Sequence, residues 1–302
     1  MRDNQVELTL GPLLFNWSPQ RTADFYAFVA DEAEIDRVYL GEVVCGKRAP
    51  LLAGVLADAA ERLARAGKAV VWSTLALPAT PRDRRGVRAL AAGPGLVEIN
   101  DISALLHRPA GAPFVAGPLL NIYNEGAAHE LVQRGCVRLC ANVELPLSAL
   151  AILSDSCPGL EIELFAFGRL PLALSGRCYH ARTHGLHKDS CQFVCDRDPD
   201  GMSVRTLEGQ PFLAVNGVQT LSHGVQVADS RLEDLRDAGV TALRLSPHTG
   251  DMAKVIASFR AFADGRFAPD DLAAAVQAAD PPGPLVNGYL HGLAGVQWSG
   301  GH

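Results

Sequence analysis

Residues 51–75 read LLAGVLADAAERLARAGKAVVWSTL, and this stretch holds one complete helix-to-strand unit. Apolar residues recur at intervals of three and four through its first half, which predicts a helix over Leu51–Ala66 with one buried face. Gly67 follows at the point where a residue in the left-handed conformation would end that helix. The apolar, β-branched run Ala69–Leu75 comes next and predicts a buried strand.

The same alternation of short apolar runs and amphipathic stretches fills most of the chain. Further helices are predicted over Thr22–Ala30, Glu125–Arg134 and Leu147–Leu153. The other predicted strands are Glu7–Leu10, Arg37–Leu40, Leu96–Ile99, Phe114–Ala116, Val137–Cys140, Glu161–Phe165, Phe212–Val215 and Ala242–Leu245. Strands that alternate with helices indicate βαβ units and a parallel sheet.

The number of these repeats distinguishes two α/β architectures. Eight or nine repeats within about 250 residues favour a closed (β/α)8 TIM-like barrel over an open, doubly wound sheet. The sequence also lacks G-x-G-x-x-G after a strand and G-x-x-x-x-G-K-[ST], the motifs typical of nucleotide-binding open sheets. We therefore predict that residues 1–302 form a single α/β barrel domain.

One segment interrupts the alternation. Residues 175–210 are polar and rich in turn-forming residues, and they contain three of the seven cysteines. An irregular segment of this length inside a compact domain is typically functional. We predict an insertion after the seventh strand that covers one end of the barrel. The tail 281–302, which begins with PPGP, is predicted to pack on the surface.

Composition argues against two classes of partner. The net charge of −6 offers no basic face for nucleic acid. No run of about 18 apolar residues predicts a transmembrane helix, and the first residues lack the apolar core of a secretory signal. We expect a cytoplasmic protein, in which thiols stay reduced and clustered cysteines favour metal binding or catalysis over disulfides.

Four cysteines form the candidate metal site. Twelve residues separate Cys178 from Cys191 in the insertion, and three separate Cys191 from Cys195. Cys45 lies just beyond the second predicted strand. Since the loops that follow barrel strands gather at one end of the barrel, Cys45 can meet the other three. Four converging thiolates suit an iron–sulfur cluster or a structural zinc ion, and the spacing alone leaves both open.

The other residues near these cysteines have separate interpretations. Nearby basic side chains are expected to offset the charge of a thiolate site and to lower the pKa of its thiols; they are Lys47, Arg48, Arg177 and Arg182. The histidines of the insertion have irregular spacing and are expected to be solvated; they are His180, His184 and His187. The remaining cysteines have apolar neighbours and are interpreted as core residues; they are Cys136, Cys140 and Cys157.

Polar residues at the predicted strand ends are candidates for a binding or catalytic pocket, because barrel active sites lie there. They are Glu42, Asn100, Asp101, Asn121, Glu144 and Ser246. Helix capping is the favoured interpretation of Asp101. Glu42, Asn121 and Glu144 are kept as pocket candidates without an assigned catalytic role.

Motifs spread from about residue 9 to 292 place the chain in a known group. They include Tyr39-Leu40-Gly41-Glu42, Cys45-x-Lys47-Arg48, Ser73-Thr74-Leu75-Ala76-Leu77, Phe114-Val115-Ala116-Gly117, Val143-Glu144-Leu145, Phe167-Gly168-x-Leu170-Pro171-Leu172-Ala173, Ser175-x-Arg177-Cys178, Asn216-Gly217-x-Gln219-Thr220 and Arg244-Leu245-Ser246-Pro247. In order and spacing the sequence resembles members of the collagenase-like peptidase family that act in oxygen-independent ubiquinone biosynthesis.

This resemblance implies a [4Fe–4S] cluster on Cys45, Cys178, Cys191 and Cys195. It implies a heterodimer with a UbiU-like relative that carries its own cluster, and a UbiT-like lipid-carrier protein as a further partner. The implied reaction is hydroxylation of the ubiquinone ring precursor without O2, with prephenate as the organic oxygen donor. Peptidase activity is not implied, since the sequence lacks H-E-x-x-H and G-x-S-x-G.

Three alternatives concern what the four cysteines do. A cluster in this position would transfer electrons or would order the insertion, which lacks a core of its own. The chain could also be a non-catalytic partner that stabilises the UbiU-like protein. The third alternative is a structural zinc site with four cysteine ligands on the same fold.

Overall fold

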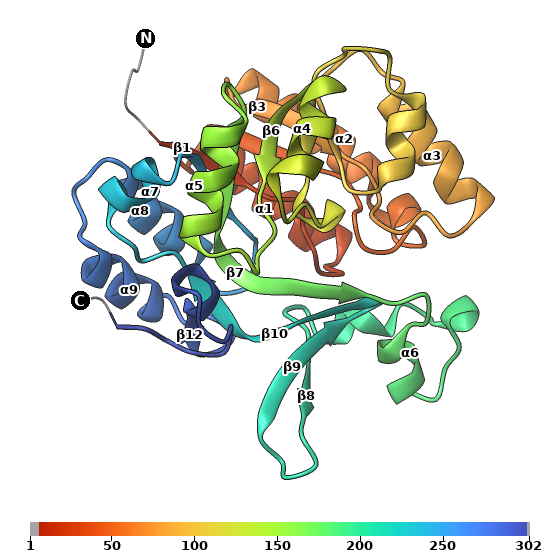
Figure 1. The fold of residues 1–302 in the computed structure, drawn as a ribbon. Coiled ribbons are helices and arrows are strands. Elements are labelled where there is room, and N and C mark those ends of the chain that lie inside the picture. Colours follow the sequence, from red (N-terminus) through yellow and green to blue (C-terminus); the bar gives the residue numbers. More distant parts are fainter. Residues whose placement is uncertain (1–5, 301–302) are drawn as a thin grey trace.

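The computed structural model describes residues 6–300, and its central feature is a closed barrel of eight parallel strands (Figure 1). These strands are β1 (Glu7–Leu10), β2 (Arg37–Leu40), β3 (Ala69–Ser73), β4 (Val97–Ile99), β5 (Phe114–Ala116), β6 (Cys136–Cys140), β7 (Glu161–Leu174) and β11 (Val240–Leu245). The barrel is closed because β11 pairs in parallel with both β7 and β1. The predicted (β/α)8 TIM-like architecture is confirmed.

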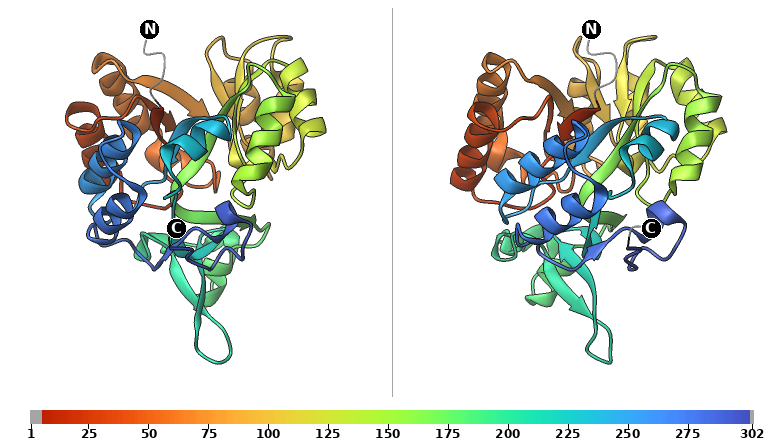
Figure 2. Two further views of the ribbon diagram at one scale, coloured as in Figure 1. Left: turned by 60° about the vertical axis from the view of Figure 1, so that its left-hand side comes forward. Right: turned by 90° about the vertical axis from the view of Figure 1, so that its left-hand side faces the viewer.

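Helices connect the strands and cover the outside of the barrel (Figure 2). They are α1 (Pro19–Asp31), α2 (Ala49–Arg65), α3 (Pro81–Ala91), η1 (Ile102–His107), η2 (Pro118–Leu120), α4 (Glu125–Gln133), α5 (Leu147–Ser156), α7 (Leu232–Asp237), α8 (Met252–Ala263) and α9 (Pro269–Gln277). In α2 the predicted apolar face is buried through Leu52, Leu56, Ala59 and Leu63. Burial of each leucine contributes about 1.5–3 kcal/mol, which holds the helix against the barrel.

Strand β7 is the element that departs most from the prediction. The predicted strand ended at Phe165, whereas β7 has 14 residues and continues out of the barrel. The register between β7 and β11 shifts between Phe165 and Phe167, and β7 leaves the barrel just after this point, beside Gly168. Gly168 has φ 128°, and a Cβ there would lie 2.6 Å from the Cβ of Ser246. An irregularity of this kind bends a strand and turns it to a new direction.

Outside the barrel, β7 begins an antiparallel sheet. It pairs with β10 (Gln219–Val227), β10 pairs with β9 (Pro211–Asn216), and β9 pairs with β8 (Met202–Arg205). We call residues 168–227 the extension, and both views of Figure 2 show it projecting from one end of the barrel. Its short helices are α6 (Tyr179–Thr183), η3 (Lys188–Ser190) and η4 (Val194–Arg197).

The extension corrects one element of the sequence prediction. The segment Phe212–Val215, predicted among the alternating strands of the parallel sheet, belongs to β9 and runs antiparallel. Only Gly217 and Val218 connect β9 to β10. A connection of two residues makes a hairpin, because a parallel pair needs a crossover of a dozen or more residues. The predicted insertion, 175–210, covers the middle of the extension but not the outer part of β7, β9 or β10.

A second apolar cluster holds the extension against the barrel. Loops after β1 and β2 supply one side of it, and α6, β9 and β10 supply the other; the residues are Leu13, Leu14, Phe15, Trp17, Val43, Val44, Cys178, Ala181, Ala214, Val218 and Leu221. Because these loops follow the carboxyl ends of their strands, the extension covers the end of the barrel where active sites of this architecture lie.

The tail is attached to the extension through β12 (Leu285–Val286), which pairs in parallel with β10. Residues 301–302 of the predicted tail, like residues 1–5, lie outside the described residues. Within 6–300, no helix combines the length and the apolar character needed to cross a membrane.

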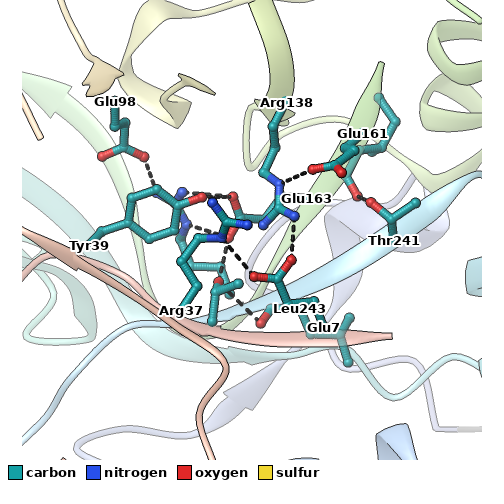
Figure 3. Close-up of polar contacts among 12 residues, drawn as sticks. Glu7, Arg37, Tyr39, Glu98, Arg138, Glu161, Glu163, Thr241 and Leu243 are labelled. Carbon is teal, nitrogen blue, oxygen red and sulfur yellow. Dashed lines mark hydrogen bonds and ion pairs between the residues drawn. The ribbon is translucent and has the colours of Figure 1, made fainter. Parts of the chain in front are cut away.

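The inside of the barrel contains buried charged groups (Figure 3) beside branched apolar side chains, such as Val71 and Val115, which pack with Tyr39. We call the following residues the interior network: Thr9, Tyr39, Glu98, Arg138, Glu163 and Arg244. The guanidinium of Arg244 lies 2.5 Å from Glu98 and 2.8 Å from Glu163, and it also lies over the Tyr39 ring at 4.0 Å. The Tyr39 hydroxyl donates to Glu163 at 2.9 Å.

The charges of the interior network keep Glu163 ionised. Burial acts to raise the pKa of Glu163, but Arg244, Arg138 and a hydrogen bond from Thr9 outweigh it and hold the pKa below its ordinary value. The network is therefore a set of paired charges inside the barrel. No local sequence pattern predicts this network, because its members come from different strands and meet only in the folded barrel.

Candidate metal centre

The four predicted cysteines line one small cavity between the barrel and the extension. Cys45 comes from the loop after β2, Cys178 precedes α6, Cys191 follows η3, and Cys195 lies in η4. Cys178 and Cys195 are buried, while Cys45 and Cys191 are partly exposed. Cys45 is distant from the other three cysteines in the sequence. It meets them because the loops that follow barrel strands gather at one end of the barrel, as predicted.

Glu42 shapes the loop that presents Cys45. Its carboxylate accepts hydrogen bonds from the backbone N–H groups of Val44 at 2.8 Å and Cys45 at 2.9 Å. Burial is the main reason that the pKa of Glu42 is raised. The loop can start directly after β2 because Gly41 has φ 142°, with its missing side chain facing the carbonyl oxygen of Ser73. Glu42 therefore lies beneath the Cys45 loop.

Local backbone geometry directs the extension cysteines into the cavity. Cys178 caps the start of α6, where its sulfur accepts from the N–H of Ala181 at 3.4 Å, and its thiol donates to the carbonyl of Gly217 at 3.2 Å. Between Cys191 and Cys195 the chain makes a left-handed turn, since Gln192 and Phe193 have φ of 50° and 55°. This turn is how a C-x₃-C spacing brings both side chains to the same cavity.

Arg48 places a buried positive charge at the cavity wall. It is 1% exposed, and its guanidinium donates to the Leu14 carbonyl at 3.3 Å and to Asn216 Oδ1 at 2.5 Å. A side chain at Gly217 would clash with this guanidinium, and Gly217 itself has φ 69°. Glycine therefore meets two requirements at this position: space for Arg48 and a left-handed turn.

Two asparagines support Cys195 from outside the cavity. Asn216 Nδ2 donates to the carbonyl oxygens of Cys195 at 2.9 Å and Asp198 at 2.8 Å. Asn16 Nδ2 lies 3.4 Å from the Cys195 sulfur and also donates to the Phe193 carbonyl. Neither asparagine was predicted to be a site residue. The motif beginning at Asn216 was the only available signal, and it did not indicate a contact.

The predicted basic residues separate into two groups. Lys47 and Arg48 line the thiol cavity, and Lys47 Nζ donates to the carbonyls of Lys188 at 2.7 Å and Asp189 at 2.9 Å, which ties the Cys45 loop to the extension. Arg177 and Arg182 instead line a neighbouring surface hollow of about 710 Å³, which shares Cys178 and Lys188 with the thiol cavity.

The predicted effect of these cations on thiol acidity is wrong for two of the cysteines. Burial raises the pKa of Cys45, and the opposing charge of Arg48 does not overcome it. Burial likewise raises the pKa of Cys178. Since metals bind thiolates, binding at this site would release protons from these thiols.

The histidine prediction also needs a correction. His180 is fully buried, with Nε2 3.0 Å from an oxygen of Asp198 and its ring stacked on His184 at 5.4 Å. It was expected to be a solvated loop residue. Its place in α6 turns it inward against β9, where Nδ1 lies 3.3 Å from the Val215 carbonyl.

Asn121 and Glu144 lie elsewhere on the molecule. Both are exposed near the ends of β5 and β6, and Asn142 connects them by donating to Asn121 Oδ1 at 3.0 Å and accepting from the Glu144 N–H at 2.9 Å. The Tyr123 hydroxyl donates to the Glu144 carboxylate at 2.6 Å. Neither residue is part of the thiol cavity.

The cysteine cavity fits a sulfur-ligated group by its donor set. Thiolates are the ligands that hold iron–sulfur clusters, and a buried guanidinium beside them offsets their charge. Among residues 6–300, no three His, Cys, Asp or Glu side chains are arranged so as to share a single metal ion. A group bound here would be held by Cys45, Cys178, Cys191 and Cys195.

Two solved structures show a distant likeness to this chain. N-acetylneuraminate lyase from Mycoplasma synoviae is 10% identical with a TM-score of 0.45, and the alignment covers 92% of this chain and 81% of that one. The tryptophan synthase complex from Pyrococcus furiosus is 11% identical with a TM-score of 0.39, covering 96% and 100%. At these values neither comparison bears on the chemistry of the site.

Comparison with protein families gives a match over nearly the whole chain. The profile of peptidase family U32 matches residues 22–292, a range that contains all four cysteines of the cavity and every strand of the barrel except β1. The chain is a member of peptidase family U32.

Proposed function

We propose that this chain binds a [4Fe–4S] cluster and is the UbiV-like subunit of a heterodimeric, O2-independent hydroxylase. The proposed substrate is the ubiquinone ring precursor of anaerobic ubiquinone biosynthesis, with prephenate as oxygen donor. A UbiU-like protein would be the other subunit, a UbiT-like lipid-carrier protein would present the substrate, and the setting would be the cytoplasm. One observation carries the proposal: four cysteines from separate segments line a single cavity beside a buried arginine.

The residues around the cavity have definable tasks in this proposal. A bound cluster would supply one-electron chemistry. The four thiols would lose their protons on binding, and Arg48 and Lys47 would balance the resulting negative charge. Asn16 would direct an N–H at the Cys195 sulfur, and hydrogen bonds to ligand sulfurs tune the potential of such a site.

The proposed hydroxylation differs from the peptidase activity that the family name indicates. Because all four cysteines would be ligands, iron would have no open position, which favours electron transfer or a structural role over direct contact with substrate. The zinc alternative differs in a measurable way, since zinc is colourless and without redox activity.

The proposal can be tested in the assembled heterodimer. The chain and its UbiU-like partner would be co-purified without oxygen and supplied with ring precursor and with prephenate that carries isotopically labelled oxygen. We expect labelled hydroxylated product from the unaltered pair, and none from the pair containing Cys191→Ala. The matched control is Cys157→Ala, which removes a buried cysteine of the barrel and should leave product formation unchanged.

The same samples distinguish the alternatives. If Cys191→Ala loses the cluster but keeps both heterodimer formation and hydroxylation, the electron-transfer role is wrong. If the unaltered chain carries the cluster and forms the heterodimer but the pair makes no product, the chain is a stabilising partner or acts on another substrate.

A further inference from the structure

The surface hollow beside the thiol cavity concentrates positive charge, and we call it the basic hollow. Arg177, Arg182 and Lys188 line it, whereas Asp189 is the single carboxylate of its lining. The whole chain has a net charge of −6. The basic hollow therefore has a charge opposite to that of the protein around it, and it favours a negatively charged partner.

The cations of the basic hollow are not used by the fold. Arg177 and Arg182 are both exposed, and among residues 6–300 neither guanidinium has a hydrogen-bond or ion-pair partner. Lys188 Nζ donates to the Gly176 carbonyl at 3.2 Å and has no carboxylate partner in the same range. These charges are accordingly free to meet charges on another molecule.

The basic hollow also reaches the proposed cluster site. Cys178 and Lys188 line both the basic hollow and the thiol cavity. At the wall between them, Lys47 Nζ donates to the backbone carbonyls of Lys188 and Asp189, which brings a further cation close to the hollow. A partner seated in the basic hollow thus lies against the segment that holds Cys178.

Size and charge together select the class of partner. Electron-transfer complexes between proteins have small interfaces and rely on complementary charge, which speeds their encounter. One open, basic hollow of about 710 Å³ beside a thiolate site suits a protruding acidic loop of such a partner. A nucleic acid would need a longer basic face, which a chain of net charge −6 does not offer.

We propose that the basic hollow docks a small, acidic electron-carrier protein, which passes electrons by way of Cys178 to a cluster in the thiol cavity. The carrier loses one electron and the cluster gains it, while no bond changes and no proton moves. As a route for electrons this inference rests on the proposed function, but docking itself requires only the charges of the basic hollow.

The first test is calorimetric titration of the anaerobically purified full chain with a plant-type [2Fe–2S] ferredoxin, an acidic one-electron carrier. We expect binding at about 50 mM salt that weakens at least about tenfold by about 300 mM, because salt screens exposed charges. Cytochrome c, a basic electron carrier, is the comparison and should not bind. Absence of ferredoxin binding, or equal binding of the two carriers, would overturn the proposal.

Matched charge reversals locate the docking. Arg182→Glu should weaken ferredoxin binding at least about fivefold, and it should fold, because Arg182 has no partner to lose. Arg65→Glu is the control: Arg65 is 73% exposed at the end of α2, before β3 begins and so at the opposite end of the barrel. This control should weaken binding less than about twofold. Equal losses would mean that net charge, and not the basic hollow, attracts the carrier.

The heterodimer tests the competing occupant of the basic hollow. Ferredoxin should bind the chain paired with its UbiU-like partner as tightly as it binds the chain alone. Loss of ferredoxin binding in the pair would assign the basic hollow to the subunit interface and overturn the proposal.

Reduction kinetics test the electron route. Arg182→Glu should slow reduction of the cluster by reduced ferredoxin, but not by reduced methyl viologen, a small cation that the basic hollow does not attract. Unchanged reduction by ferredoxin, or equal slowing with both reductants, would contradict the route.

A cluster-ligand variant keeps this inference separate from the proposed function. Cys191→Ala should lose iron and still bind ferredoxin at least as tightly as the unaltered chain, since the cluster would add negative charge beside the basic hollow. Loss of product with ferredoxin binding intact contradicts only the proposed function. Loss of ferredoxin binding with the cluster intact contradicts only the present inference.

Discussion

The interior network and the thiol cavity both bury polar side chains, but they satisfy them differently. In the interior network, the guanidinium of Arg244 is matched by Glu98 and Glu163, and the Tyr39 hydroxyl adds a further bond. In the thiol cavity, four sulfur atoms share one buried guanidinium and weak amide donors. In the first arrangement each guanidinium nitrogen of Arg244 has a carboxylate partner within the protein. The second arrangement is the one that we propose holds a bound group.

This difference helps to separate structural from functional polar groups. A buried ion pair that is fully hydrogen-bonded is costly to break but offers no atom to a ligand. Unmatched soft donors around a cavity contribute little to folding until a metal binds. Variants of the two regions should therefore change different measured quantities.

Breaking the interior network should have the largest effect on stability. Arg244→Leu leaves the buried Glu98 and Glu163 without their shared cation, so we expect the free energy of unfolding to fall by about 3–5 kcal/mol. Urea unfolding followed by circular dichroism measures it. Arg231→Ala is the control, because Arg231 pairs with Asp234 on the surface and its loss should leave the midpoint unchanged. Similar midpoints for the two variants would show that the interior network does not stabilise the barrel.

Removing the cation of the thiol cavity should affect both stability and metal content. Arg48→Gln loses charged hydrogen bonds to Leu14 and Asn216, which predicts a loss of about 2–3 kcal/mol and less iron per chain. The neighbouring Lys47→Gln removes bonds from a partly exposed side chain and should cost about 1 kcal/mol or less. Urea unfolding and iron analysis of both variants compare the two positions. If Lys47→Gln loses more iron than Arg48→Gln, the buried guanidinium is not the principal counter-charge.

The smallest predicted effect concerns the contact between extension and barrel near Asp200. His248 Nδ1 lies 3.3 Å from Asp200, and His248 Nε2 accepts from the Arg169 N–H at 3.1 Å. Burial lowers the pKa of His248 despite Asp200. Burial acts to raise the pKa of Asp200, but hydrogen bonds from His248 and Thr249 outweigh it, and the pKa lies below its usual value.

Both pKa shifts make the folded chain less stable in acid. The unfolded chain binds more protons than the folded one, first at His248 below about pH 6.5 and then at Asp200 as the pH falls below about 4. Stability should decline from about pH 7 to pH 5.5, and His248→Gln should make that decline shallower. Urea midpoints across this range provide the measurement. A variant with the unaltered slope would mean that His248 is protonated as easily in the folded chain as in the unfolded one.

Much of the fold could be predicted from the sequence because its signals are local. The spacing of apolar residues in α2 and the glycine after it were enough to identify the repeating unit. The extension was harder, because the sequence around Gly168 gives no sign that β7 continues past Phe165 into a second sheet. That bend depends on a close approach to Ser246, which is distant in the sequence.

The candidate site was predictable to the level of its cysteines. Barrel topology explains why Cys45 could be grouped with three residues far along the chain. Asn16 and Asn216 could not be assigned, because each contacts Cys195 only after the loop after β1 and the β9–β10 hairpin come together. Thiol acidity was also mispredicted, since the depth of burial cannot be read from neighbouring charges in the sequence.

The identity of the group bound by the thiol cavity is the central claim, and metal analysis of anaerobically purified protein tests it most directly. The account predicts about four iron and four sulfide per chain, with broad absorbance at about 400 nm, as a [4Fe–4S] cluster requires. It also predicts that Cys191→Ala loses the iron while Cys157→Ala keeps it. One zinc per chain without iron, or iron retained in Cys191→Ala, would contradict it.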